Sequence, residues 1–390
     1  MVKIHPPQGN GSPSDSAYLA ADTMRPPDSV RPQKNAAKSP ESNPDFATIR
    51  IVSRVVLFVL RKCWMVCGVS FVTIFVIYWY CSSILALLLL VFAITGLVYQ
   101  VGDWLLYHPE QPAHSRLYVP SPSMLGLPAE SLQLKTHDGV TLHAWLIKQP
   151  PELFSQAPTL LYLHGNAGNI GHRLPNVGGL FHRCGCNILL LEYRGYGRSE
   201  GTPSEEGLYL DAQAGLEFLL SHPGLDQTRL LVFGRSLGGA VALDLASRPD
   251  QAQHLLGVIV ENTFSSIPDM ARVLFGWRLL RWLPDFCYKN QFRSIDKVPK
   301  VTVPILFVCG LSDALIPPSM TQRLYQSCSS PMKRLVTFES GTHNETWECR
   351  GYYQSLSLFI NDLVANSHLQ RGASEWPVGH TCIHVPADII

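Results

Sequence analysis

The chain has 390 residues, of which 46% are hydrophobic, so it is long enough to bury the core of one large domain with appendages. Its 31 Lys and Arg residues nearly balance its 30 Asp and Glu residues, and the formal net charge is +1 at pH 7. This balance offers no electrostatic footprint for nucleic acid, and no helix-turn-helix, zinc-finger or RNA-binding signature occurs, so no nucleic-acid partner is expected.

The first 50 residues are rich in proline, serine, asparagine and aspartate, as in the stretches PPQGNGSPSDS and MRPPDSVRPQKN. They show little apolar periodicity, and a segment that cannot bury apolar surface cannot offset the conformational entropy lost on folding. We therefore predict that residues 1–50 are disordered.

A long apolar run follows. From Cys63 to Gly102 the sequence contains no Asp, Glu, Lys, Arg or His, whereas about 20 apolar residues are enough to cross a bilayer. The strongest window begins at Ser83, too far from the N-terminus for a simple cleaved signal peptide. Residues 63–102 are therefore predicted to be a transmembrane anchor, with the lipid bilayer as partner. The length also fits a hairpin of two spans that turns near Ser82, although no Gly, Pro or Asn marks a turn there.

The charges on the two sides of the run differ in sign. Asp103 and Glu110 follow it, and four basic residues precede it: Arg50, Arg54, Arg61 and Lys62. The positive-inside rule places the basic flank, and with it the N-terminus, in the cytosol. A single type II span, which we expect, puts the downstream domain in a lumen or outside the cell, whereas the hairpin returns that domain to the cytosol.

Downstream of a proline-rich connector, apolar runs of strand length alternate with segments of helical periodicity. Strands are predicted at residues 132–135, 141–147, 159–163, 187–193, 229–233, 256–260, 303–309 and 334–338, and helices at 205–221, 237–247, 319–327 and 347–364. This alternation predicts an α/β fold, with a mostly parallel sheet, helices on both faces and an antiparallel entry hairpin turning at Asp138-Gly139. The domain is predicted to span residues 107–364, followed by a C-terminal tail at 365–390.

The segment LLVFGRSLGGA, from Leu230 to Ala240, joins a buried-strand pattern directly to a G-x-S-x-G turn and a small-residue helix start. On such a strand-to-helix corner the serine takes strained backbone angles, and glycines are needed where neighbouring elements approach closely. The hydroxyl of Ser236 would then project above the sheet, within reach of a base. This is the pattern of a nucleophile elbow, so Ser236 is the predicted nucleophile.

A serine hydroxyl needs a histidine to take its proton, and the histidine needs an acid that holds its tautomer. Where a sheet carries such an elbow, the chain order is Ser, then Asp or Glu, then His. Asp313 follows the apolar strand VPILFVCG and is the predicted acid, with Glu261, at the end of another strand, as the competitor. His343 follows the last predicted strand and is the predicted base.

The developing oxyanion needs N–H donors that are already in place. The amide after the nucleophile belongs to Leu237, and the second donor is expected in the loop after the third strand. There the sequence HGNAGN directly follows the strand TLLYL, so Asn166 is the predicted second donor. His164 is predicted to be a structural hydrogen-bonding residue rather than a base.

Several segments together resemble the alpha/beta-hydrolase domain-containing proteins, a family of the alpha/beta-hydrolase superfamily. They are GRSLGGA, HGNAGNIGHRLPN, EYRGYGRSEG, EEGLYLD, VENTFSSIP, GLSDALIPP and GTHNETW, and the resemblance covers roughly Tyr107 to Val364. It implies an alpha/beta-hydrolase fold, an integral membrane serine hydrolase with one type II anchor, and a triad on Ser236, Asp313 and His343. The proline-rich N-terminus is longer than is usual in that family.

The predicted function is therefore a membrane-anchored serine hydrolase that cleaves an acyl ester or thioester, from a lipid or an acylated protein such as a palmitoyl-protein, through an acyl-enzyme. The alternative is a non-catalytic binding or scaffold protein on the same fold, which a missing triad member would favour. No metal, nucleotide or flavin cofactor is expected, because neither Cys-x-x-Cys zinc spacing nor a P-loop or dinucleotide glycine motif occurs.

Two further expectations concern the surroundings of the predicted site. The segment 264–292 combines large apolar residues, including Trp277 and Trp282, with interspersed basic residues, and predicts a lid over an acyl chain. Packing on the sheet is the alternative for that segment. Asn344-Glu345-Thr346 is a glycosylation sequon if the domain lies outside the cytosol.

Overall fold

The structure is a computed structural model that describes residues 44–80, 83–275, 284–370 and 379–387. Of residues 1–50, which were predicted to be disordered, 1–43 lie outside the described residues, whereas 44–50 form the start of a helix, so the prediction is wrong for those seven residues. The chain divides into two units, 1–62 and 63–390, and the second contains the sheet and all the residues predicted above to carry out chemistry.

Two helices precede the domain. They are α1 (Pro44–Tyr80), which departs from helical geometry at Cys63, and α2 (Ser83–Leu106). Within the described residues, Cys63–Tyr80 and Ser83–Leu106 are both long and apolar enough to cross a membrane. The described part of the uncharged run thus lies in two helices, and residues 81–82 lie outside the described residues.

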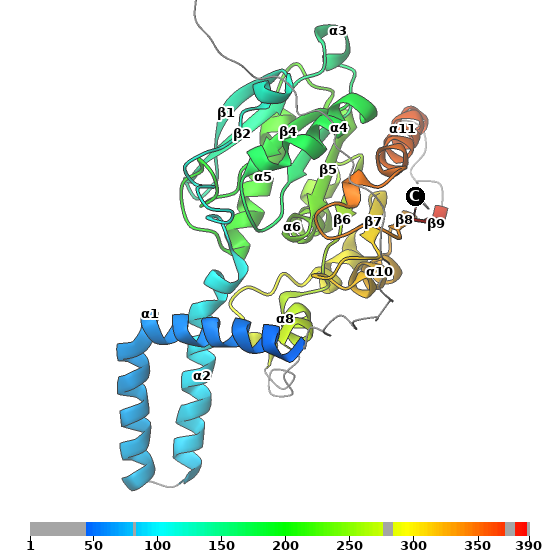
Figure 1. Cartoon of the computed structure of the whole chain (residues 1–390). Coiled ribbons are helices and arrows are strands. Elements are labelled where there is room, and N and C mark those ends of the chain that lie inside the picture. Colours follow the sequence, from blue (N-terminus) through cyan, green and yellow to red (C-terminus); the bar gives the residue numbers. More distant parts are fainter. Residues whose placement is uncertain (1–43, 81–82, 276–283, 371–378, 388–390) are drawn as a thin grey trace, which may run out of the picture. The chain divides into compact units, whose positions relative to one another are not determined.

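A sheet of nine strands forms the centre of the domain, in the order β1-β2-β4-β3-β5-β6-β7-β8-β9 (Figure 1). The strands are β1 (Ala129–Lys135), β2 (Thr141–Ile147), β3 (Thr159–Leu163), β4 (Asn187–Leu191), β5 (Leu230–Arg235), β6 (Gly257–Glu261), β7 (Ile305–Gly310), β8 (Met332–Phe338) and β9 (Gly379–Val385). The β1–β2 and β2–β4 pairs are antiparallel and all other pairs are parallel. The predicted parallel sheet with an antiparallel entry hairpin is confirmed.

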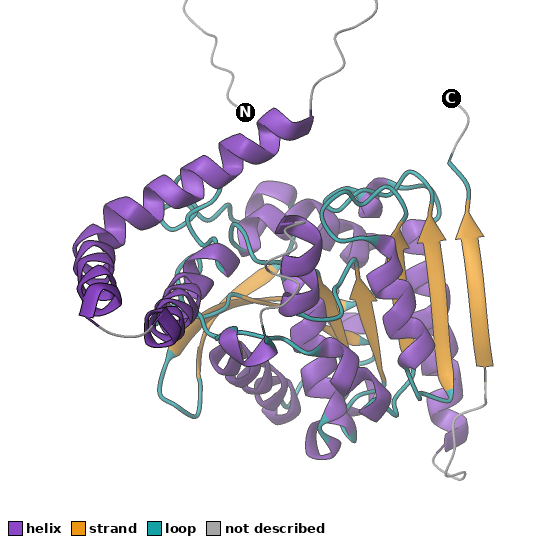
Figure 2. Ribbon diagram, turned by 90° about the horizontal axis from the view of Figure 1, so that it is seen from below, coloured by secondary structure: helices purple, strands orange, loops and turns teal. Residues whose placement is uncertain are grey.

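Helices cover both faces of this sheet (Figure 2). The described helices of the domain are α3 (Pro151–Phe154), α4 (Leu174–Cys184), α5 (Glu205–Ser221), α6 (Leu237–Ser247), α7 (Pro249–Ala252), α8 (Ile267–Phe275), α9 (Ser294–Lys297), α10 (Pro318–Ser327) and α11 (Tyr352–Gln370). Short 3-10 turns lie at η1 (Pro122–Leu125), η2 (Ile170–Arg173), η3 (Gln227–Arg229), η5 (Asp285–Cys287), η6 (Val298–Lys300) and η7 (Thr346–Glu348).

Alternate residues of each central strand enter two separate cores. In β5, for example, Leu230 and Val232 pack with α5, α6 and α10, whereas Leu231 and Phe233 pack with α4 and α11. Side chains of successive strand residues point to opposite faces, so a strand covered on both sides must be apolar throughout. This explains the unbroken apolar runs from which the strands were predicted.

The C-terminal boundary differs from the expected one. Helix α11 continues to Gln370, and β9 lies inside the segment 365–390 that was expected to be a tail, where it pairs in parallel with β8. The side chains of β9 are exposed or half-buried, so this edge strand is held by its backbone ladder and lacks the apolar pattern that reveals a buried strand. The sheet therefore includes residues that sequence pattern placed outside the domain.

Candidate active site

The predicted nucleophile lies on the corner between β5 and α6. Ser236 has φ 54° and ψ −118°, angles that a residue with a side chain rarely adopts, and it is only 7% exposed. Its N–H donates to the carbonyl oxygen of Glu261 at 2.8 Å, and its own carbonyl accepts from the Thr263 hydroxyl at 2.9 Å. A Cβ atom on Gly238 would collide with the carbonyl oxygen of Leu163 at the end of β3. The neighbouring strands thus hold the strained corner in place.

The structure brings the predicted base and acid to this serine. His343, in the loop after β8, places Nε2 at 3.1 Å from Oγ of Ser236 and Nδ1 at 2.7 Å from Oδ2 of Asp313, in the loop after β7. The other oxygen of Asp313 accepts from the backbone N–H groups of Leu315 and Ile316, both at 2.8 Å. With the carboxylate fixed in this way, Nδ1 of His343 carries the proton and Nε2 is free to accept the serine proton.

Glu261, the competing acid, faces other partners. Its carboxylate lies 3.4 Å from Nε of Arg235 and accepts a hydrogen bond from the hydroxyl of Tyr352. Burial raises the pKa of Glu261. The hydrogen-bond geometry therefore favours Asp313 as the partner of His343.

Two residues that the sequence reasoning missed hold the histidine loop. Arg235, the residue between glycine and serine in the G-x-S-x-G motif, donates to the carbonyl oxygen of His343 at 2.7 Å and to Oδ1 of Asn344 at 3.0 Å. Asn262, directly after β6, donates to the carbonyl oxygen of Thr342 at 3.1 Å and accepts from the N–H of Gly310 at 2.8 Å. Arg235 lies in the elbow and Asn262 directly follows a strand. These positions were the only feature of the sequence that could have identified them.

The two segments predicted to supply the oxyanion donors both reach the nucleophile. Leu237 is the first residue of α6, so its N–H has no acceptor in a preceding helical turn. The loop after β3 also approaches, since a Cβ atom on Gly165 would stand 3.5 Å from Cβ of Ser236. Asn166 is the next residue, and its carbonyl oxygen accepts from the Tyr196 hydroxyl at 2.8 Å.

His164 has the contacts of a structural residue. It is fully buried, its Nδ1 donates to the carbonyl oxygen of Gly165 at 2.7 Å, and its Nε2 lies 3.6 Å from Oε1 of Glu192. Burial lowers the pKa of His164 to about 3 and raises the pKa of Glu192 to about 8, so both side chains are neutral at pH 7. The ring therefore fixes the peptide plane between Gly165 and Asn166.

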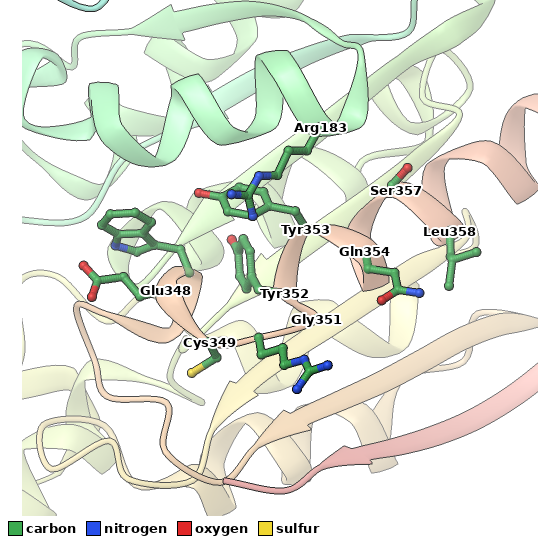
Figure 3. A pocket seen from close by; sticks show the side chains of 11 residues that line it. Arg183, Glu348, Cys349, Gly351, Tyr352, Tyr353, Gln354, Ser357 and Leu358 are labelled. Carbon is green, nitrogen blue, oxygen red and sulfur yellow. The ribbon is translucent and has the colours of Figure 1, made fainter. Parts of the chain in front are cut away.

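A cavity of about 610 Å³ lies away from these residues. It surrounds the start of α11, where Trp347, Cys349 and Arg350 line it beside Tyr353, and the guanidinium of Arg183 stacks over the Tyr353 ring at 4.9 Å (Figure 3). None of the residues predicted to carry chemistry lines this cavity. Within the described ranges, no three His, Cys, Asp or Glu side chains gather closely enough to hold a metal ion.

The predicted lid is only partly described, whereas the predicted sequon lies within the described residues. Trp277 and Trp282 lie outside the described residues, while α8 and η5 represent the remainder of the segment 264–292. In the sequon, Asn344 is exposed and Thr346 is fully buried, with its hydroxyl donating to the carbonyl oxygen of Thr342 at 2.6 Å.

Comparisons with known proteins agree with this fold. A sequence model of the alpha/beta hydrolase fold matches residues 158–286. The chain is 40% identical over 287 residues to the alpha/beta hydrolase domain-containing protein WAV2 of Arabidopsis thaliana, an alignment that covers 70% of this chain and 91% of that protein. It is 38% identical over 273 residues to the protein bem46 of Schizosaccharomyces pombe, which covers 69% and 89%. An uncharacterized membrane protein of Saccharomyces cerevisiae is 36% identical over 257 residues, covering 65% and 87%.

Among solved structures, an esterase of Pyrococcus furiosus, Pf2001, superposes with a TM-score of 0.52 at 20% sequence identity, covering 66% of this chain and 98% of that one. An identity this low shows the fold alone. The relatives, in contrast, align over about nine-tenths of their own length and confirm the resemblance found in the sequence. The chain therefore belongs to the alpha/beta hydrolase family.

Proposed function

We propose that this protein is a membrane-anchored serine hydrolase that cleaves an acyl ester or thioester through an acyl-enzyme on Ser236. The observation that carries the proposal is the continuous hydrogen-bonded chain from Ser236 Oγ through the His343 ring to Asp313, at 3.1 and 2.7 Å. Family membership supports a hydrolase, and a non-catalytic binding protein would have no use for a strained serine with a base and an acid aligned behind it.

In the proposed reaction, Oγ of Ser236 attacks the acyl carbonyl carbon while its proton passes to Nε2 of His343. The carbonyl oxygen becomes an oxyanion that accepts hydrogen bonds from the backbone N–H groups of Leu237 and Asn166. His343 then protonates the departing alcohol or thiol, which leaves the acyl group on Ser236. A water molecule, deprotonated by His343, attacks the acyl-enzyme, and the acid product leaves as Ser236 regains its proton.

An apolar acyl chain is the proposed substrate feature, because apolar side chains near the predicted lid face solvent. Val273 and Leu274 on α8 are about half exposed, and Phe286 on η5 is 76% exposed. On the opposite side of η5, Cys287 is buried and lies beside Thr95 of the apolar helix α2. A segment that packs against a membrane helix and exposes apolar side chains could both meet the bilayer and receive an acyl chain from it.

We expect kcat/KM to rise with acyl chain length, measured with p-nitrophenyl esters and acyl thioesters from two to sixteen carbons. Complete burial at about 0.8 kcal/mol per methylene corresponds to a gain of roughly 15-fold for each two carbons, and partial burial to a several-fold gain, until the pocket is full. Phe286→Ala is expected to flatten this rise, while Leu358→Ala, a 54% exposed leucine on α11, serves as the matched control. Equal rates for acetyl and long-chain substrates would refute the acyl-chain assignment.

The two apolar helices support the proposed membrane anchor. Two topologies are proposed for it, a single type II span and a hairpin of two spans. A single type II span follows from the basic flank before Cys63 and places Asn344 where it can be glycosylated. The division into two helices, each long enough to span, favours the hairpin, which returns the domain to the cytosolic side.

Protease treatment of sealed microsomes should distinguish the two orientations. Protection of the domain, together with a mass shift that Asn344→Gln removes, is the result expected for the single span. Digestion of the domain from the outer side, with no glycan at Asn344, is the result expected for the hairpin. An untagged lumenal protein in the same vesicles controls for leakage.

A further inference from the structure

We propose that the end of the membrane helix α2 is a positioning element of the oxyanion hole, so that the anchor takes part in catalysis as well as in localisation. This inference rests on the proposed function. It concerns residues 103–108, which are the last turn of α2 and the two residues after it. It also concerns Asn166, the residue that is predicted to supply the second oxyanion donor.

Asn166 is tied to this segment by its side chain and by its backbone. Nδ2 of Asn166 donates to the carbonyl oxygen of Leu106 at 2.9 Å, and the N–H of His108 donates to the carbonyl oxygen of Asn166 at 3.1 Å. Leu106 is the last residue of α2. A carbonyl oxygen at the end of a helix accepts no hydrogen bond from an N–H of its own helix. The oxyanion loop therefore supplies the donor that satisfies the helix end.

The end of α2 is itself fastened to the domain. Asp103 forms an ion pair with Lys289 and accepts a hydrogen bond from Nδ2 of Asn290 at 2.5 Å. The hydroxyl of Tyr107, which is buried, donates to Oδ1 of Asn290 at 3.0 Å. The same oxygen accepts from the N–H of Glu205 at the start of α5, at 2.9 Å. The last turn of α2 thus has a defined place on the domain.

The contacts of Gly165 and Asn166 hold the backbone around Asn166. The carbonyl of Gly165 is held by His164, and the carbonyl and side chain of Asn166 are held by Tyr196 and by the end of α2. The peptide planes on both sides of Asn166 are therefore constrained, and one of them contains the Asn166 N–H. Because an oxyanion donor contributes to rate only when it is aligned before charge develops, loss of the α2 contacts should lower kcat and leave substrate binding nearly unchanged.

The test uses the full-length protein in proteoliposomes and the variant Asn166→Ala, which removes the side-chain donor and keeps the backbone N–H. We expect kcat to fall about 10- to 100-fold, less than the roughly 100- to 1,000-fold loss when an oxyanion donor is removed outright, because the backbone N–H is kept, with KM within about twofold. A trifluoromethyl ketone, which forms an oxyanion on the serine, is expected to bind more weakly by the same factor as kcat. Leu105→Ala, an exposed residue in the same turn of α2, is the matched control.

Tyr107→Phe is a second variant that keeps the ring and removes only the hydrogen bond to Asn290. It should shift kcat and inhibitor affinity together by about two- to tenfold, since a net hydrogen bond contributes on the order of 1 kcal/mol. Unchanged kcat and inhibitor affinity in both variants would overturn the inference, as would a rise in KM at constant kcat. If the wild-type protein neither reacts with a fluorophosphonate nor hydrolyses any acyl ester, the proposed function fails, and the inference fails with it.

Discussion

Replacing Ser236 with alanine is expected to abolish fluorophosphonate labelling and to lower kcat by about 10⁴- to 10⁶-fold, because the side chain that carries the acyl group is removed. His343→Ala should be nearly as severe, since a hydroxyl without a base is a weak nucleophile. Labelling is read on gels of the membrane fraction, and kcat is measured with a p-nitrophenyl ester. Ser247→Ala, at the end of the same helix α6, is the matched control.

The double variant gives a sharper result than either single one. Residues that act as a unit have non-additive effects, so Ser236→Ala with His343→Ala should be little worse than Ser236→Ala alone. If the Ser236→Ala protein still labels and hydrolyses at the wild-type rate, another residue is the nucleophile. If the two losses multiply, Ser236 and His343 do not work together, in spite of the 3.1 Å between their side chains.

Asp313→Asn is also expected to have a large effect, a fall in kcat of about 10⁴-fold with little change in KM. Nδ1 of His343 donates to Asp313 at 2.7 Å, and an asparagine amide in that place would favour the other tautomer, whose Nε2 carries a proton and cannot accept one from serine. The measurement is steady-state kinetics on the folded variant, with circular dichroism to check the fold.

Glu261→Gln is the comparison that separates the two candidate acids. Because Glu261 contacts Arg235 and Tyr352, this substitution is expected to change kcat by less than about tenfold. Its effect should appear instead in the thermal midpoint, since a fully buried contact is altered. A larger loss of kcat in Glu261→Gln than in Asp313→Asn would exchange the roles assigned to the two carboxyl groups.

The sequence by itself was enough to predict the elbow, because its features are local. A buried strand, a G-x-S-x-G turn and a helix of small residues are consecutive, and glycine is required where the chain passes closely between neighbours. The choice of Asp313 and His343 needed one more rule, that groups after parallel strands meet at the same edge of the sheet. That rule predicts that both residues lie near Ser236. In the structure His343 lies 3.1 Å from Ser236 and 2.7 Å from Asp313, which agrees with it.

Helix α4 and strand β9 could not be found in this way. Pro175 and the pair Gly178-Gly179 interrupt the helical pattern of α4, which is stabilised by packing against α11. Strand β9 exposes most of its side chains and is selected by backbone hydrogen bonds to β8. In both elements the stabilising partner is distant in sequence, so local propensity and periodicity carry no trace of it.

The same reason separates the nucleophile from the residues that hold its surroundings. Arg235 and Asn262 fix the loop of His343, and the end of α2 fixes Asn166, through contacts that span 60 to 109 positions along the chain. In the sequence these are an arginine, an asparagine and the end of an apolar run, residue types with many other uses. Only the tertiary structure decides that they converge on one serine, because hydrogen bonds depend on distance and direction in space and not on separation along the chain.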